Sequence, residues 1–106
     1  MSEQEFEKVV DETLSQLRET LIVKAKEYRR NNNPFHNFEQ GEKRSDRTRE
    51  QVLDGFLLKH EISIADMTTD LATGKLPQQA AVNEKFNDNL IYLLIKKAMF
   101  LDRIKF

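Results

Sequence analysis

The chain has 106 residues, which is the size of one domain and too short for two domains that each bury a core. Its net charge of −1 gives no field for holding duplex nucleic acid, and its lack of cysteine excludes disulfides, thiolate nucleophiles and cysteine zinc sites. The shares of 39% hydrophobic and 33% charged residues are typical of amphipathic helices with solvated outer faces.

The chain also lacks the features expected of an exported or membrane-embedded protein. The segment from Met1 to Phe6 is acidic and polar, unlike a signal peptide. The longest apolar run, Leu90 to Ile95, is far shorter than the roughly 20 residues that cross a bilayer. We therefore expect a cytoplasmic protein that does not enter a membrane.

The pattern of apolar residues predicts an all-α fold that begins with a helix over about residues 3–30. No proline or glycine occurs in residues 3–28, and apolar side chains recur there every three or four positions. Ser2 is a candidate N-cap. The run from Asn31 to Pro34 should end the helix, because asparagine favours left-handed turns and the residue before a proline avoids helical angles.

Residues 31–45 are expected to form an irregular loop that Phe35 and Phe38 anchor to the core. Asn37 stands beside these rings and His36, and amide and aromatic groups in this combination can hydrogen-bond and stack on a nucleobase. The alternative is a loop with no function beyond its two anchoring rings.

A second helix is predicted over residues 46–72 from the continued helical period. Ser45 or Asp46 is the favoured N-cap, and a capping box made by Thr48 and Gln51 is the second choice.

Two glycines and two arginines in or beside this helix have expected roles of their own. Gly74 is the expected terminator, and Gly55, which is unfavourable inside a helix, is expected to mark close packing or a kink. Arg47 or Arg49 is a candidate phosphate clamp, against the simpler interpretation of a solvated helix start.

A third helix is predicted over residues 77–103, with Pro77 in its first turn. Leu90 to Leu101 is apolar on nearly every side, which indicates a helix contacted by several neighbours. The short connection 73–76 requires the last two helices to be antiparallel. We expect one domain over residues 1–106, a small bundle of three main helices that a homo-oligomer completes.

Polar residues at helical spacing interrupt the two apolar helices. On the second helix Lys59, Ser63 and Asp66 share one face, and His60 lies beside them. Charged helix faces are common, so a solvated surface is the alternative to a site.

On the third helix Glu84, Asp88 and Tyr92 follow one another at intervals of four residues. Two carboxylates one turn apart can share a Mg²⁺ ion, a hard cation that takes oxygen ligands, although such pairs also occur on many surface helices. Antiparallel packing should place Asp66 level with Glu84.

We therefore predict one polar cleft between the second and third helices, lined by Lys59, Asp66, Glu84 and Asp88. Tyr92 or His60 is expected at its rim.

Four segments carry a resemblance to a known family: KAKEY (24–28), NPFHNF (33–38), KHEISIADM (59–67) and EKFNDNLIYLLIKKAM (84–99). Together they resemble small proteins encoded by phages and prophages, related to nucleotide-modification-associated domains. They are more distantly similar to the all-helical, MazG-like nucleoside triphosphate pyrophosphatases.

The resemblance implies magnesium-dependent hydrolysis of a nucleotide between its α and β phosphates, within an oligomeric helix bundle. Acidic residues of two adjacent helices would hold the metal, here Asp66, with Glu61 a further candidate, and then Glu84 and Asp88. The wider family has two glutamates three apart on the earlier helix and a glutamate and aspartate three apart on the later one. This chain instead has Lys-His-Glu at 59–61 and a step of four from Glu84 to Asp88.

The leading hypothesis is a phage-type protein that binds or hydrolyses nucleotides in a bacterial or phage-infected cell. Asp66, Glu84 and Asp88 would bind Mg²⁺, and Lys59 or His60 would contact phosphate as the catalytic groups. Nucleotide contacts are expected from Asn37, Ser63 and Tyr92. The alternative is a non-enzymatic helical accessory or interaction protein; a helix-turn-helix regulator is less favoured, because no basic recognition helix follows a compact turn.

Overall fold

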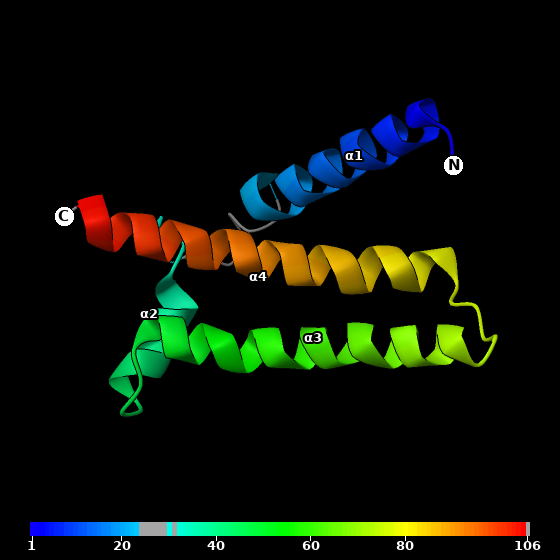
Figure 1. The fold of residues 1–106 in the computed structure, drawn as a ribbon. Coiled ribbons are helices and arrows are strands. Elements are labelled where there is room, and N and C mark those ends of the chain that lie inside the picture. Colours follow the sequence, from blue (N-terminus) through cyan, green and yellow to red (C-terminus); the bar gives the residue numbers. More distant parts are fainter. Residues whose placement is uncertain (24–29, 31, 106) are drawn as a thin grey trace.

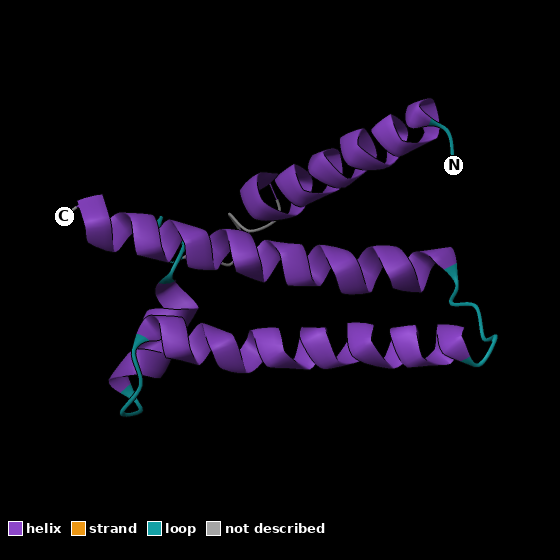
Figure 2. Ribbon diagram, viewed as in Figure 1, coloured by secondary structure: helices purple, strands orange, loops and turns teal. Residues whose placement is uncertain are grey.

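The computed structural model describes residues 1–23, 30 and 32–105, and the all-α prediction is confirmed. The elements in chain order are α1 (Glu3–Arg18), the single π-helical turn η1 (Glu19–Val23), α2 (His36–Lys43), α3 (Arg49–Ala72) and α4 (Gln79–Lys105). Figure 2 shows that helices account for nearly all of the described chain, which contains no β-strand.

The first helix begins where the sequence predicts. Ser2 forms a capping box, since its hydroxyl accepts a hydrogen bond from the backbone N–H of Glu5 and the Glu5 carboxylate returns to the Ser2 backbone. Helical geometry continues through Val23 by way of the π-helical turn, and the part of the predicted 3–30 helix over residues 24–29 lies outside the described residues. Asn32 has a φ of +56°, as expected from an asparagine-rich turn.

The prediction of an irregular loop over residues 31–45 is wrong, because α2 occupies much of it. Phe38 is 8% exposed and packs with residues of α3 and α4. A Cβ on Gly41 would come within 2.7 Å of Val52, so a glycine allows α2 to lie against α3. The short helix is therefore stabilised by contacts with distant segments rather than by its own sequence pattern.

At the ends of α3, the predicted terminator is confirmed and the favoured N-cap is wrong. Thr48 is the N-cap and forms the capping box with Gln51, so the favoured caps Ser45 and Asp46 were wrong. The Ser45 hydroxyl instead donates to the carbonyl of Gly41 at 2.8 Å, at the end of α2. Gly74 has a φ of +87° just after the helix, as predicted.

Helices α3 and α4 form an antiparallel hairpin, as the short connection requires (Figure 1). Three ion pairs join the two helices along the hairpin: Arg49 with Asp102 at 3.0 Å, Arg103 with Glu50, and Lys96 with Asp54 at 2.7 Å. Further along, Nδ1 of His60 lies 3.8 Å from the Asp88 carboxylate. The register of the hairpin places Asp66 level with Glu84.

The buried core lies at one end of this hairpin. It consists of Phe38, Leu53, Leu57 and Met99. Helix α1 approaches α4 at its C-terminal end and diverges from it toward the N-terminus (Figure 1). The radius of gyration is 16.1 Å, against about 13 Å for a compact domain of this length, so much apolar surface stays exposed. None of the described helices is long and apolar enough to cross a membrane.

Candidate functional site

A pocket of about 310 Å³ lies where η1, the start of α2 and the middle of α4 meet. Its size is at the lower end of the range for small-molecule sites, and it combines apolar walls with a few polar groups. The lining residues are Thr20, Leu21, Asn33, Pro34, His36, Asn37, Phe38, Asp88, Ile91, Tyr92 and Ile95.

Aromatic rings surround Tyr92, which lines the pocket from α4. Its ring stacks on His60 at a centroid distance of 5.0 Å and on Phe56 at 6.1 Å, and it meets Phe38 edge to face at 6.3 Å. Burial raises the pKa of the Tyr92 phenol above its ordinary value, and the Asp88 carboxylate adds to the increase. The phenol therefore stays a neutral hydrogen-bond donor at neutral pH.

The opposite side of the pocket comes from the turn before α2 and from its first residues. Asn33 is fixed there, since its side-chain oxygen accepts from the backbone N–H of Phe35 at 3.0 Å and its amide group donates to Glu39. Asn37 lies one helical turn further on and is exposed. Its carboxamide makes no hydrogen bond with the described residues and so offers a donor and an acceptor to a ligand.

Asp88 is the one carboxylate among the described lining residues. Its side chain is 41% exposed, and one oxygen lies 3.8 Å from Nδ1 of His60, whose ring is held against Tyr92. The carboxylate can therefore accept hydrogen bonds from hydroxyl or amino groups of a bound molecule.

The structure brings together some of the predicted site residues and separates the others. Asn37, Asp88 and Tyr92 line the pocket, and His60 contacts two of them. The remaining predicted residues lie outside the pocket lining, and they are Lys59, Ser63, Asp66 and Glu84.

These four residues have other surroundings. Lys59, Asp66 and Glu84 are exposed, and the Ser63 hydroxyl donates to the backbone carbonyl of Lys59 within its own helix at 3.1 Å. The predicted cleft that joins Lys59, Asp66 and Glu84 to Asp88 is therefore not formed within one chain.

The predicted magnesium ligands do not fit a metal site in this chain. Among the described residues, no group of three or more histidine, aspartate or glutamate side chains is close enough to hold a metal ion. Asp66 and Glu84 share a level on the hairpin but do not converge with Asp88, because spacing along a helix leaves open how each side chain is turned relative to the neighbouring helix.

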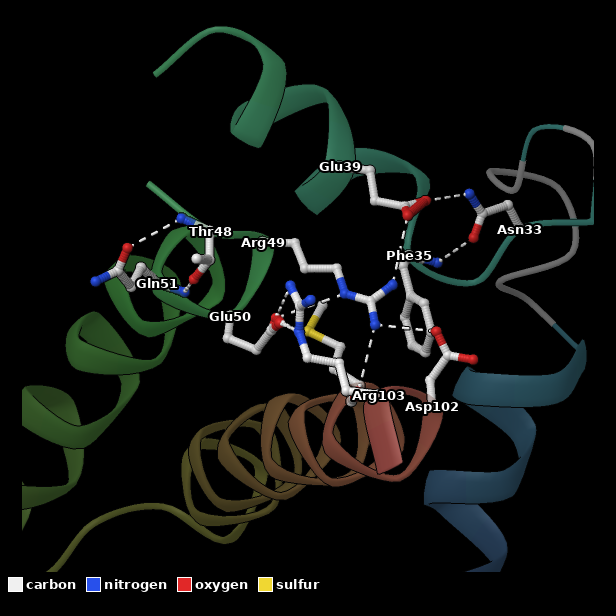
Figure 3. Close-up of polar contacts among 10 residues, drawn as sticks. Asn33, Phe35, Glu39, Thr48, Arg49, Glu50, Gln51, Asp102 and Arg103 are labelled. Carbon is white, nitrogen blue, oxygen red and sulfur yellow. Dashed lines mark hydrogen bonds and ion pairs between the residues drawn. The ribbon is translucent and has the colours of Figure 1, made fainter. Parts of the chain in front are cut away.

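Arg49 belongs to a structural cluster rather than to a phosphate clamp. The residue is 7% exposed, and its guanidinium contacts Asp102 at 3.0 Å, Glu39 at 3.4 Å and Glu50 at 3.5 Å (Figure 3). It also lies over the ring of Phe35, 4.7 Å from the centroid. The positive charge of Arg49, a candidate phosphate contact in the sequence, is therefore already neutralised by three carboxylates.

Thr20 and Asn33 are polar lining residues that the sequence did not single out as contact groups. Thr20 lies in η1, and π-helical turns of this kind are frequent at functional sites. No sequence signal distinguishes Thr20, because a π-helical turn leaves no composition pattern. His36, which the sequence indicated as a contact group beside Asn37, does line the pocket.

Comparisons with protein-family models, with curated proteins and with solved structures give no match for this chain. The chemistry of the pocket is therefore taken from its own residues. Amide, imidazole, hydroxyl and carboxylate groups among apolar walls suit a small molecule with hydrogen-bonding edges.

Proposed function

We propose that this protein binds a nucleotide, with the base in the pocket between η1, α2 and α4. The observation that carries the proposal is the presence of Asn37, Asp88 and Tyr92 in one pocket of about 310 Å³. These residues come from segments about fifty positions apart, and they supply an amide, a carboxylate and an aromatic ring to one small volume.

Each group has a defined task in this proposal. The free carboxamide of Asn37 pairs with the edge of the base, as amides do with the donor and acceptor groups of nucleobases. Apolar contact comes from Phe38 and Ile91, while the Tyr92 hydroxyl donates to the ligand. Asp88 accepts from an amino group of the base or from a sugar hydroxyl.

Binding is better supported than hydrolysis. The family resemblance implies a magnesium-dependent phosphohydrolase, but a metal-assisted reaction needs several oxygen ligands around the ion. The described pocket lining has Asp88 as its one carboxylate. We accordingly propose a nucleotide-binding protein of a bacterial or phage-infected cytoplasm.

The test is isothermal titration calorimetry with a panel of nucleosides and nucleotides, each measured with and without Mg²⁺. We expect at least one of them to bind, and Asn37→Ala and Asp88→Asn to weaken that binding by about tenfold or more, which is the loss of one to two hydrogen bonds. Asp66→Asn is the matched control, because Asp66 is exposed and outside the pocket. Binding that is unaffected by Asn37→Ala and Asp88→Asn, or the absence of binding by every compound, contradicts the proposal.

We also propose that the chain self-associates, as expected for an accessory or interaction protein of helical type. The observation behind this second function is the large exposed apolar surface of α1 and α4, which includes Phe6 at 60%, Leu14 at 60% and Phe100 at 54% exposure. Surfaces of this kind mark interaction sites in water-soluble chains. Light scattering from micromolar to millimolar concentration tests it, and a monomer throughout refutes it.

A further inference from the structure

Helix α1 has an apolar face that its own chain covers at one end only. Leu17 is buried at 6% exposure, and Gln16 accepts a hydrogen bond from Asn87 of α4 at 2.7 Å. Toward the N-terminus α1 diverges from α4 (Figure 1). The side chains on the same face as Leu17 are left 38–60% exposed there, and they are Phe6, Val9, Val10 and Leu14.

Helix α1 has few contacts of its own to stabilise it, which indicates a partner on this face. Isolated helices shorter than about 12–15 residues are marginal in water, and in proteins most helical stability comes from packing of an apolar face. The 16 residues of α1 include one buried side chain, Leu17, and the capping box at Ser2 contributes only about 1 kcal/mol. A second surface that covers Phe6 to Leu14 would supply the missing stabilisation.

Helix α4 offers a matching surface on the side away from α3. Met99 and Tyr92 face α3, whereas the opposite side carries apolar residues with the alternating steps of four and three that helix-helix seams use. These residues are Phe86, Leu90, Leu93, Phe100 and Ile104, and they are 36–80% exposed. Lys97 occupies the remaining position in the series.

The charges of the two helices are complementary. Helix α1 contains five acidic and two basic side chains, while α4 contains three acidic and five basic ones. Lys97 is exposed within the apolar series and makes no ion pair with the described residues. An acidic helix is suited to this basic one and unsuited to an anionic membrane surface, which attracts basic amphipathic helices.

We propose that the apolar face of α1 in one copy packs on the outer face of α4 in a second copy, and that a two-fold axis makes the contact reciprocal. This inference rests on the self-association proposed above and specifies its surface. The nine apolar side chains together expose roughly 900 Å² at roughly 100 Å² each. Each partner in a standard stable interface buries about 800 Å², so the two faces are large enough to form a dimer.

Crosslinking between two chains tests the contact directly, since the natural sequence has no cysteine. One chain carries Val10→Cys and the other Leu93→Cys, and the mixture is treated with a short bis-maleimide. We expect a crosslinked dimer that contains one copy of each chain. In the control mixture Leu76→Cys replaces Leu93→Cys, because Leu76 is 80% exposed in the α3–α4 connection, and we expect little crosslinking there.

Two substitutions test the energetics. Leu14→Gln keeps a good helix former and Lys97→Glu reverses the charge inside the α4 series, and each should raise the dimer Kd about tenfold or more. Leu76→Gln and Lys75→Glu make the same chemical changes at exposed connection residues and should leave the Kd unchanged. Circular dichroism checks that the variants keep their helices.

The outcomes separate the two proposals. A dimer that neither Leu14→Gln nor Lys97→Glu weakens, and that crosslinks no better through α1 and α4 than in the control, refutes this interface and leaves self-association standing. A wild-type chain that stays monomeric at all concentrations overturns both. Nucleotide binding is measured separately and depends on neither result.

Discussion

Replacing Arg49 with methionine should strongly destabilise the fold, because one guanidinium holds the start of α3, the C-terminal part of α4 and α2 together. Its Nη2 donates to the carbonyl of Met99 at 3.3 Å and to Asp102 at 3.0 Å, while Nη1 lies 3.4 Å from Glu39 (Figure 3). Methionine retains an apolar stem of similar reach and removes the charge and every donor, so the substitution isolates the polar contacts.

The size of the loss in unfolding free energy depends on how well water can solvate the carboxylates that Arg49 leaves unpaired. Removal of one member of a buried ion pair typically costs 3–5 kcal/mol, because the other charge is left unpaired. Here Asp102 and Glu39 have side chains 40% and 33% exposed, so water can solvate them in part. Glu50, at 12% exposure, keeps its bidentate partner Arg103. We therefore expect a loss of about 2–3 kcal/mol.

Urea unfolding followed by circular dichroism at one fixed protein concentration measures this loss. At an m value of roughly 1.5 kcal/mol per M, the midpoint should fall by about 1–2 M. The control Lys8→Met removes an exposed pair with Glu12, whose side chains are 75% and 55% exposed, and should change stability by less than about 0.5 kcal/mol. If Arg49→Met is as stable as the control, the cluster contributes nothing and the reasoning from burial fails.

Three further predictions concern helix stability and ionisation. Gly55→Ala should stabilise the protein by up to about 1 kcal/mol in the same urea assay, since no side chain or backbone of another described segment lies within 4 Å of the added methyl group. The close packing expected at Gly55 is therefore not found, and a loss of stability would reveal a hidden contact. Thr48→Ala should cost about 1 kcal/mol by removing the acceptor for the Gln51 backbone N–H, and an unchanged midpoint would show that the cap is dispensable. The phenol of Tyr92 should ionise above the ordinary tyrosine pKa of about 10, because burial disfavours the phenolate. The stabilisation from burying the neutral Tyr92 phenol is therefore complete below a pH of about 10 and is lost as the pH rises through the pKa of the folded state. Ultraviolet titration of the Tyr28→Phe variant, in which Tyr92 is the one remaining tyrosine, measures this pKa. A pKa of about 10 or less would contradict the burial.

Local rules account for the parts of the fold that could be predicted. The helical period of apolar residues, the capping residue Ser2 and the terminator Gly74 act within a few positions of themselves. The antiparallel hairpin follows from the short connection at 73–76, because two long helices joined in this way have to lie side by side. The level positions of Asp66 and Glu84 follow from that hairpin and the rise per residue.

Contacts between distant segments decided the features that the sequence did not predict, namely the helix α2 and the N-cap of α3. Helix α2 forms because Phe38 is buried among residues of α3 and α4. The sequence indicated that Phe38 anchors its segment to the core, but no local signal reveals that the segment is helical. Likewise Thr48 is selected over Ser45 as the N-cap of α3, since the Ser45 hydroxyl bonds to the end of α2.

The candidate site shows the same division most clearly. Spacing identified Asp88 and Tyr92 as neighbours on one helix, and composition singled out Asn37, so the sequence alone supplied residues but not their grouping. Consecutive residues in a helix differ in direction by about 100°, so His60 contacts Asp88 and Tyr92 while Lys59, one position earlier, is exposed. The pocket itself depends on how η1, α2 and α4 lie against one another. Side-chain packing between helices sets their angles, and the spacing of residues within one helix does not contain that information.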